Sequence, residues 1–156
     1  MLVLWLMLVL SARCSGADEI PLDRAEQSST FRSADAGTAA SANAIDGNLT
    51  TRAKTRYEDH AWLRVYFLSY SNVEKVVIER GYSYSTACRY SVSVFAGDVK
   101  TLCGVYNKPQ ASMYSEVVQC SGNRGESVML ESKDCNTELS IYEIKVYYKP
   151  GRHSIL

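Results

Sequence analysis

The sequence predicts an all-β protein, built as a single sandwich or jelly roll. Its 156 residues are enough for one domain of ordinary size and too few for two. From Ala61 onward the chain divides into short β-rich runs separated by turn residues, which is typical of these folds. Helical periodicity is scarce. The expected strands cover residues 62–68, 74–79, 89–95, 116–120, 127–130 and 140–148.

Residues 1–17 are expected to be a signal peptide. An unbroken apolar run from Leu2 to Leu10 precedes small residues around Gly16 and Ala17, the order of an h-region and a cleavage site. The run is too short to cross a bilayer, and no run of spanning length follows it. We therefore expect a secreted domain of residues 18–150 with a short tail, 151–156, and no transmembrane segment.

Cleavage of that leader would remove Cys14 and leave four cysteines. An even number in a secreted chain indicates two disulfides, and the sequence permits three connectivities among Cys88, Cys103, Cys120 and Cys135. A zinc site is the alternative. It is disfavoured because neither a Cys-x-x-Cys motif nor a histidine cluster accompanies these residues.

The segment before the β-rich region ends in a loop that is rich in oxygen donors. Residues 18–44 are rich in Ala, Ser and Thr, and we expect an entry strand near 25–31 followed by a loop or one helical turn. Within residues 41–51, hard oxygen donors that suit calcium surround one glycine. The alternative is a polar loop in which Asp-Gly-Asn only makes a tight turn. The donors are Asn43, Asp46, Asn48 and Thr51.

Asn48 also opens the sequence Asn-Leu-Thr, the only N-glycosylation sequon in the chain. Main-chain ligation of a cation would leave its side chain able to carry a glycan, whereas ligation by the side chain would exclude one. In the last expected strand, Glu143 alternates onto the face opposite Ile144 and Val146, and therefore points off the core. It either completes a cation shell begun by Asp46 or is a solvated residue of an edge strand.

Four short motifs, in this order, resemble the F-type lectins (the fucolectin and tachylectin group), which are similar to discoidin or coagulation factor type C domains. The resemblance covers roughly residues 20–149 and implies a galactose-binding-like jelly-roll β-sandwich. The motifs are Ala25-Glu26-Gln27-Ser28-Ser29, the loop from Ser41 to Asn48, Val76-Val77-Ile78-Glu79-Arg80-Gly81 and Ile141-Tyr142-Glu143-Ile144-Lys145-Val146.

The resemblance also implies specific bonds. One structural calcium would be shared by the carboxylates of Asp46 and Glu143. Further oxygens would come from the main chain of Asn43, Asn48 and Tyr142 and from Thr51. A disulfide would join Cys103 to Cys120, which leaves Cys88 with Cys135.

F-type lectins bind fucose through a histidine and two arginines, and His60, Arg80 and Arg89 stand nearest to those positions. Arg80-Gly81 matches the opening of the family's loop, but Tyr82 replaces an acidic residue and the loop's paired cysteines are absent. The resemblance implies recognition of a fucose- or galactose-type glycan. Instead of the family's fucose site, Tyr82 in this loop could form a stacking surface for another glycan or a contact surface for a protein. The alternative is a calcium-stabilised adhesion or interaction module that has lost the sugar site.

Composition disfavours other classes of function. The 17 basic and 17 acidic residues balance and form no run, whereas nucleic acid requires a basic stripe and anionic membranes a positive surface. No nucleophile elbow, P-loop, dinucleotide fingerprint or metalloprotease motif is present. We therefore expect a protein without catalytic activity, whose partners are glycans or an extracellular protein.

Overall fold

The computed structural model describes residues 17–33, 37–81, 88–107, 114–133 and 135–148. Apart from Ala17, the predicted signal peptide lies outside these ranges, as does the predicted tail. The elements are β1 (Asp18–Glu19), β2 (Leu22–Gln27), β3 (Arg32–Ser33), β4 (Gly37–Thr38), η1 (Ser41–Ala44), β5 (Ala53–Lys54), β6 (Glu58–Asp59), β7 (Trp62–Arg80), β8 (Arg89–Ala96), β9 (Val99–Asn107), β10 (Tyr114–Lys133), β11 (Asn136–Thr137) and β12 (Ser140–Tyr148).

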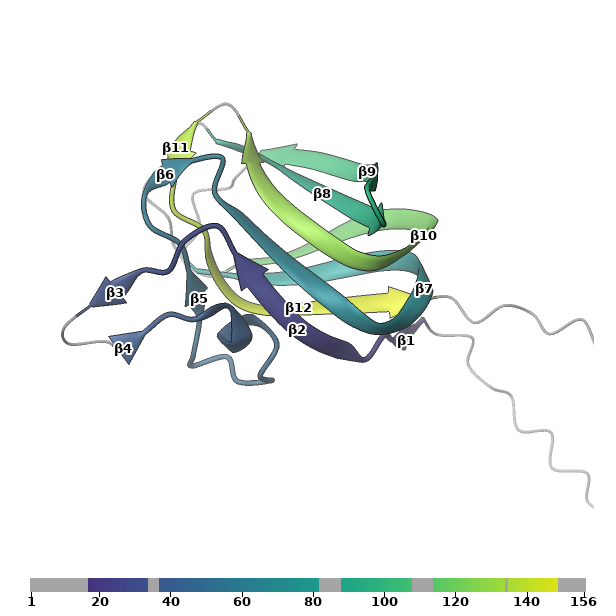
Figure 1. Cartoon of the computed structure of the whole chain (residues 1–156), viewed down its shortest axis with the longest axis horizontal. Coiled ribbons are helices and arrows are strands. Elements are labelled where there is room, and N and C mark those ends of the chain that lie inside the picture. Colours follow the sequence, from purple (N-terminus) through teal and green to yellow (C-terminus); the bar gives the residue numbers. More distant parts are fainter. Residues whose placement is uncertain (1–16, 34–36, 82–87, 108–113, 134, 149–156) are drawn as a thin grey trace, which may run out of the picture.

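Two long strands, β7 and β10, form the centre of the fold. They pair antiparallel along their lengths, from Tyr114 opposite Arg80 to Glu131 opposite Trp62. The first half of β7 also pairs with β2 and its second half with β12, while the second half of β10 pairs with β8. Figure 1 shows both strands curving round, so that the sheet folds into two facing layers. This arrangement confirms the all-β jelly-roll sandwich.

The bend has a local cause in β10. Its pairing with β7 shifts register between Gln119 and Asn123, where Ser121 and Gly122 have positive φ angles of 54° and 80°. Such bulges bend a strand and increase its twist. Nearby, a Cβ on Gly125 would lie 2.1 Å from the carbonyl oxygen of Phe95, so only glycine permits this approach of β10 to β8.

The core lies between the two layers and follows the period-two alternation of the strands. In β7, alternate apolar residues on both sides of the bend are buried, and those of β8 and β12 face them. Each such side chain contributes about 1.5–3 kcal/mol relative to an exposed one. Across the described chain, the largest fully buried side chains include Tyr90, Ile20, Leu63, Ile78, Leu130, Leu139, Ile141 and Ile144.

Several predicted strands are parts of longer ones. The expected strands at 62–68 and 74–79 are one element, β7, and those at 116–120 and 127–130 are both within β10. The entry strand is β2, which begins earlier than expected. The edge strand β9 was not predicted, because Val99 and Leu102 are exposed and its polar residues hide the alternation.

Two disulfides are present in the described part of the chain. One joins Cys88, just before β8, to Cys135, just before β11, and the other joins Cys103 in β9 to Cys120 in β10. This is the pairing that the family resemblance implied. Among the residues that the structure describes, no helix is long and apolar enough to cross a membrane.

Candidate functional site

The oxygen-rich loop is held on the sandwich by its apolar residues. Ala44, at the end of η1, is fully buried, and Ile45 packs against the core. Gly47 has a φ angle of +72°, in the left-handed region that favours glycine, so the chain can turn back sharply. The loop therefore has a fixed base on β12 and β2 and an exposed tip.

Hydrogen bonds within the loop hold its polar side chains. The Asp46 carboxylate accepts the main-chain N–H of Asn48 at 2.9 Å and the hydroxyl of Thr51 at 2.6 Å. The side-chain oxygen of Asn48 accepts from both the N–H and the hydroxyl of Thr50. By contrast, the Asn43 amide points elsewhere and donates to the carbonyl of Arg52. Asp46 is therefore bonded to the Thr51 hydroxyl and to the main chain of Asn48, whereas the side chains of Asn43 and Asn48 bond elsewhere.

Glu143 meets this loop from the other end of the chain. Its Oε2 accepts the N–H of Gly47 at 2.9 Å, across a separation of 96 residues. The side chain points off the core, as alternation predicted, but it is only 5% exposed because the loop covers it. Glu143 is therefore not the solvated edge-strand residue of the alternative interpretation, because it is buried and β12 pairs with both β1 and β7. The neighbouring Tyr142 is half-buried.

The electrostatics of this corner favour a cation. Burial raises the pKa of Glu143, and the nearby Asp46 carboxylate raises it further, against the opposing effect of the Gly47 N–H. The residues that the structure describes form no ion pair with either carboxylate. Lys145 lowers the pKa of Glu143 through its charge but forms no ion pair with it, so a hard divalent ion would neutralise the two neighbouring acids. We call loop 41–51 together with Glu143 the cation corner.

Within the described ranges, no group of three or more His, Cys, Asp or Glu side chains is close enough to hold a metal. A cation here would therefore depend on two carboxylates, with hydroxyl and main-chain oxygens completing its shell. That composition suits calcium, which accepts carbonyl oxygens readily, and not zinc, which prefers nitrogen and sulfur ligands.

The predicted sugar residues lie at one end of the sandwich. Arg80 ends β7, and its guanidinium carbon lies 4.1 Å from the centroid of the Tyr90 ring. The Arg80 side chain is buried, with 4% of its surface exposed. Gly81 then donates its N–H to the carbonyl of Ser140, and a Cβ there would lie 2.7 Å from the Ser140 hydroxyl. Close packing against β12 thus fixes the backbone position of Arg80.

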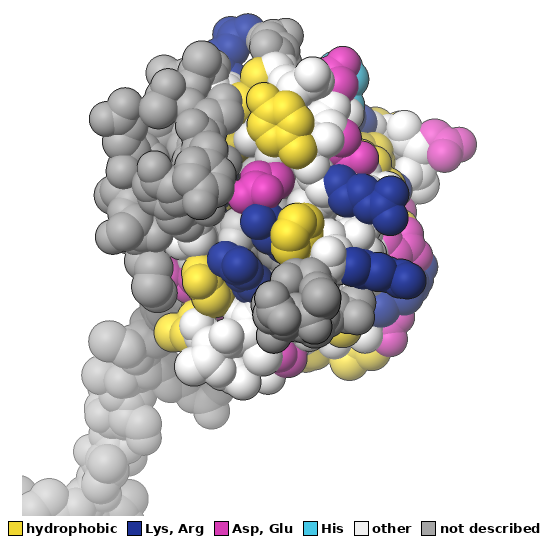
Figure 2. Space-filling view, turned by 90° about the vertical axis from the view of Figure 1, so that its left-hand side faces the viewer, with side chains coloured by type: hydrophobic (Ala, Val, Ile, Leu, Met, Phe, Trp, Pro, Cys, Tyr) yellow, Lys and Arg dark blue, Asp and Glu magenta, His cyan; other side chains and the backbone are white. Residues whose placement is uncertain are grey.

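The other two residues are exposed. Arg89 begins β8 next to Tyr90, and strand alternation directs its side chain to the opposite face from that ring. His60 lies in the turn before β7 with a φ of 54°, and its Nε2 is 3.5 Å from a carboxylate oxygen of Asp59. Tyr82 lies outside the described residues. Figure 2 views the end of the molecule that carries β3 to β6 and these strand ends. We call His60, Arg80 and Arg89 the candidate sugar site.

Tyr90, which holds Arg80, was missed by the sequence reasoning. Its ring is fully buried, and its hydroxyl lies 3.4 Å from the Thr137 hydroxyl. In the sequence it is one of several alternating inward residues of β8. No local signal distinguishes an aromatic ring that supports an arginine from one that only fills the core.

Comparison with known families identifies the family to which this fold belongs. Residues 43–130 match the model of a coagulation factor type C family described as a NedA-like, galactose-binding domain. The chain belongs to this family. The match includes the oxygen-rich loop and the whole candidate sugar site, whereas β12 lies beyond it. A comparison with curated protein sequences gave no significant match.

Solved structures with the same fold as this NedA-like domain include several sugar-binding modules. A histidine mutant of the lectin binding domain of Lectinolysin, complexed with Lewis b, is 25% identical over 80% of this chain and 91% of that one, with a TM-score of 0.62. The family 32 module of NanJ from C. perfringens, in complex with galactose, is 20% identical over 83% and 97%, with a TM-score of 0.67. A fucolectin from striped bass (Morone saxatilis) serum is 20% identical over 86% and 50%, with a TM-score of 0.62.

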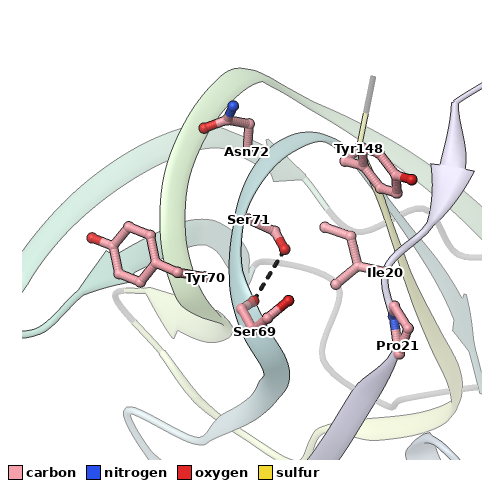
Figure 3. Close-up of a pocket in the computed structure, with 7 residues that line it drawn as sticks. All are labelled: Ile20, Pro21, Ser69, Tyr70, Ser71, Asn72 and Tyr148. Carbon is pink, nitrogen blue, oxygen red and sulfur yellow. Dashed lines mark hydrogen bonds between the residues drawn. The ribbon is translucent and has the colours of Figure 1, made fainter. Parts of the chain in front are cut away.

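A separate hollow of about 390 Å³ lies at the other end of the NedA-like domain, where β1 and β12 meet the bend of β7. Figure 3 shows Tyr70, Asn72 and Tyr148 around it, with the Ser71 hydroxyl donating to the carbonyl of Ser69. None of the predicted site residues lines this hollow. The predicted sugar residues and this hollow therefore occupy different ends.

Proposed function

We propose that the chain is a secreted carbohydrate-recognition domain that binds a fucose- or galactose-type glycan at the candidate sugar site, without catalysis. The observation that carries this proposal is the match to a galactose-binding family over residues 43–130, which include His60, Arg80 and Arg89. The lectin domain that is 25% identical to this chain supports it, because its structure contains the fucosylated antigen Lewis b.

The three side chains have complementary chemistry for sugar hydroxyls. Guanidinium groups supply only donors, and a neutral histidine supplies an acceptor as well. Stacking on Tyr90 holds Arg80 in one orientation, so little side-chain entropy is lost when a sugar binds. Arg89 and His60 are exposed and provide the surface that a ligand can reach.

Calcium at the cation corner is part of the proposal. Asp46 and Glu143 would supply carboxylates, Thr51 its hydroxyl or carbonyl, and Asn43, Asn48 and Tyr142 main-chain oxygens. The ion would neutralise two facing acids and join the loop to β12. Because main-chain ligation leaves the exposed side chain of Asn48 available, this arrangement is compatible with N-glycosylation there. Secretion after cleavage of the apolar leader belongs to the same proposal, and the two disulfides are consistent with it.

One observation favours a second candidate function, a calcium-stabilised extracellular module that binds protein and not sugar. Arg80 is 4% exposed, so it offers a ligand little surface. On that alternative the stacked arginine is a structural element of the core, and the exposed residues around it contact a protein partner.

A glycan array separates the two functions. We expect the mature protein in calcium to bind fucosylated or galactosylated glycans, with binding about tenfold weaker or more in Arg89→Ala, because a charged hydrogen bond is lost. Arg124→Ala, an exposed arginine on the bend of β10, is the matched control and should bind normally. A blank array from a protein with normal thermal stability would contradict sugar recognition and favour the interaction module.

A further inference from the structure

A basic strip lies beside the cation corner and was not identified from the sequence. Through β5 the chain is extended, with Ala53 and Thr55 buried at 2% and 1% exposure. The alternate residues Arg52, Lys54 and Arg56 lie on the opposite side of the segment, where Arg56 is exposed and Arg52 and Lys54 are half-buried. We call these three residues the basic strip.

The neighbouring segment runs alongside this strip and holds its centre. The N–H of Phe31 donates to the carbonyl of Lys54 at 2.8 Å, and the N–H of Arg56 donates to the hydroxyl of Ser29 at 2.9 Å. The Lys54 ammonium lies 4.3 Å from the centroid of the Phe31 ring and 2.9 Å from a carboxylate oxygen of Glu138. The middle charge of the strip is therefore already neutralised.

The flanking arginines are not neutralised in this way. Among the described residues, no ion pair involves Arg52, Arg56 or the adjacent exposed Arg32. The acid nearest to Arg56 along the chain, Glu58, instead accepts from the hydroxyls of Ser28 and Ser29. Within the described part of the chain, this surface therefore carries guanidinium groups that have no ion-pair partner.

This surface lies at the same end of the molecule as the candidate sugar site. Figure 2 shows Lys and Arg side chains on that end, with hydrophobic and acidic side chains between them. Tyr57, which follows Arg56 directly, is 66% exposed. Guanidinium groups beside an exposed aromatic ring suit a ligand that has both anionic groups and sugar faces.

We propose that the basic strip binds the sulfate or carboxylate groups of an anionic polysaccharide. The choice of a polysaccharide rests on the proposed function, because it extends a glycan from the candidate sugar site across the adjacent surface. Nucleic acid fits less well, since its binding depends on a basic field over a whole face and this chain has no net charge. Arginine suits both anionic groups because its planar fork contacts two oxygens at once.

The test uses three polymers with one backbone: dextran sulfate, carboxymethyl dextran and neutral dextran. The mature protein in calcium should bind one or both charged polymers and not neutral dextran, and the two charged polymers separate sulfate from carboxylate recognition. In Arg52→Gln/Arg56→Gln, affinity should fall by about two- to thirty-fold, the range expected for two exposed ion pairs. Binding should also weaken as salt rises.

The matched control is Lys75→Gln/Arg124→Gln, which removes the same charge near the bend of β7 and β10, where these side chains lie over Tyr147 and Tyr70. It should bind like the wild type. An equal loss in the control, no loss in Arg52→Gln/Arg56→Gln, or tighter binding of duplex DNA than of both charged dextrans would overturn the proposal.

The outcome also separates this inference from the proposed function. Neutral fucosides on the array should bind Arg52→Gln/Arg56→Gln as well as the wild type. Binding of charged dextran with a blank neutral array would support the basic strip and reject the neutral sugar site. Binding of neutral fucosides without binding of either charged dextran would reject the basic strip alone.

Discussion

At the cation corner, two segments that are far apart in the chain meet in a hydrogen bond between the exposed Gly47 and the buried Glu143. At the candidate sugar site, a buried arginine stands next to an exposed arginine and an exposed histidine. In the first arrangement the groups restrain one another through hydrogen bonds between the exposed loop and Glu143, whereas two of the three side chains in the second are open to solvent. Changes at the corner should therefore alter stability first, and changes at the sugar site should alter binding first, with Arg80 as the exception.

The largest expected effect is on the strand that carries Arg89. Replacing the disulfide partners in Cys88→Ser/Cys135→Ser opens a loop of 47 residues and should lower the free energy of unfolding by about 4 kcal/mol. Removing the Cys103–Cys120 disulfide, with a separation of 17, should cost about 3 kcal/mol. Urea unfolding curves measure both losses.

Binding assays complete that comparison. The two sites are independent if folded Cys88→Ser/Cys135→Ser loses glycan binding but is still stabilised by calcium. Loss of both properties in a folded protein would show that the closed and open regions form one unit.

Calcium should give the next largest effect on the free energy of unfolding, and it should act only through the cation corner. Free calcium at one hundred times its dissociation constant should stabilise the folded protein by about 2.7 kcal/mol relative to chelator. Asp46→Asn and Glu143→Gln should abolish this gain, because each removes a carboxylate. Asp98→Asn, in the exposed turn after β8, is the control and should retain it. A melting temperature that is indifferent to chelator would reject the metal.

The two regions also differ in how much of them the sequence predicts. The oxygen-rich loop was recognisable because its chemistry lies within residues 41–51, and strand alternation placed Glu143 off the core. That the loop covers Glu143 was not predictable, because this depends on how Ala44 and Ile45 pack against the sandwich. The burial of Arg80 had no signal either, since its supporting ring, Tyr90, is in another strand.

The same limit applies to the fold as a whole. Alternation identified the buried strands, and β12 was predicted with its observed bounds. It did not show that β7 and β10 continue through their bends, because Leu68 and Tyr70 are exposed there and turn-like residues interrupt the pattern. Continuity at these bends depends on pairing between the two strands, which is a tertiary property.

A smaller effect should separate the two arginines of the candidate sugar site. Arg80→Ala removes a buried stem and a cation stacked on Tyr90, and should cost about 2 kcal/mol in the free energy of unfolding. Arg89→Ala at an exposed position should change it by about 0.5 kcal/mol or less. Thermal melts of both variants, read with their glycan affinities, test this contrast. Equal stability losses would remove the distinction between a supporting and a contacting arginine.

The smallest expected effect is a pH dependence that reports on the corner alone. Because burial and Asp46 raise the pKa of Glu143 in the folded state, the folded protein holds this proton more tightly than the unfolded chain. In chelator, stability should therefore fall as pH rises from the unfolded value of about 4.5 through the folded pKa, and stay constant above it. Urea unfolding between pH 4 and pH 7, compared between wild type and Glu143→Gln, isolates this contribution.

In calcium, the stability of the wild type should change with pH in the opposite direction. The ion requires the ionised carboxylate, so its binding should release a proton, and wild-type stability in calcium should rise over the pH range in which it falls in chelator. Glu131 provides an internal contrast. Burial raises the pKa of its carboxyl group, but bonds to Lys100 and Lys133 outweigh this and lower it, so its stabilisation is lost as pH falls. The contribution of Glu131 is the same in wild type and Glu143→Gln, so it cancels when their stabilities are subtracted. If the difference in unfolding free energy between the two proteins in chelator does not change with pH, Glu143 is not the buried acid of the cation corner.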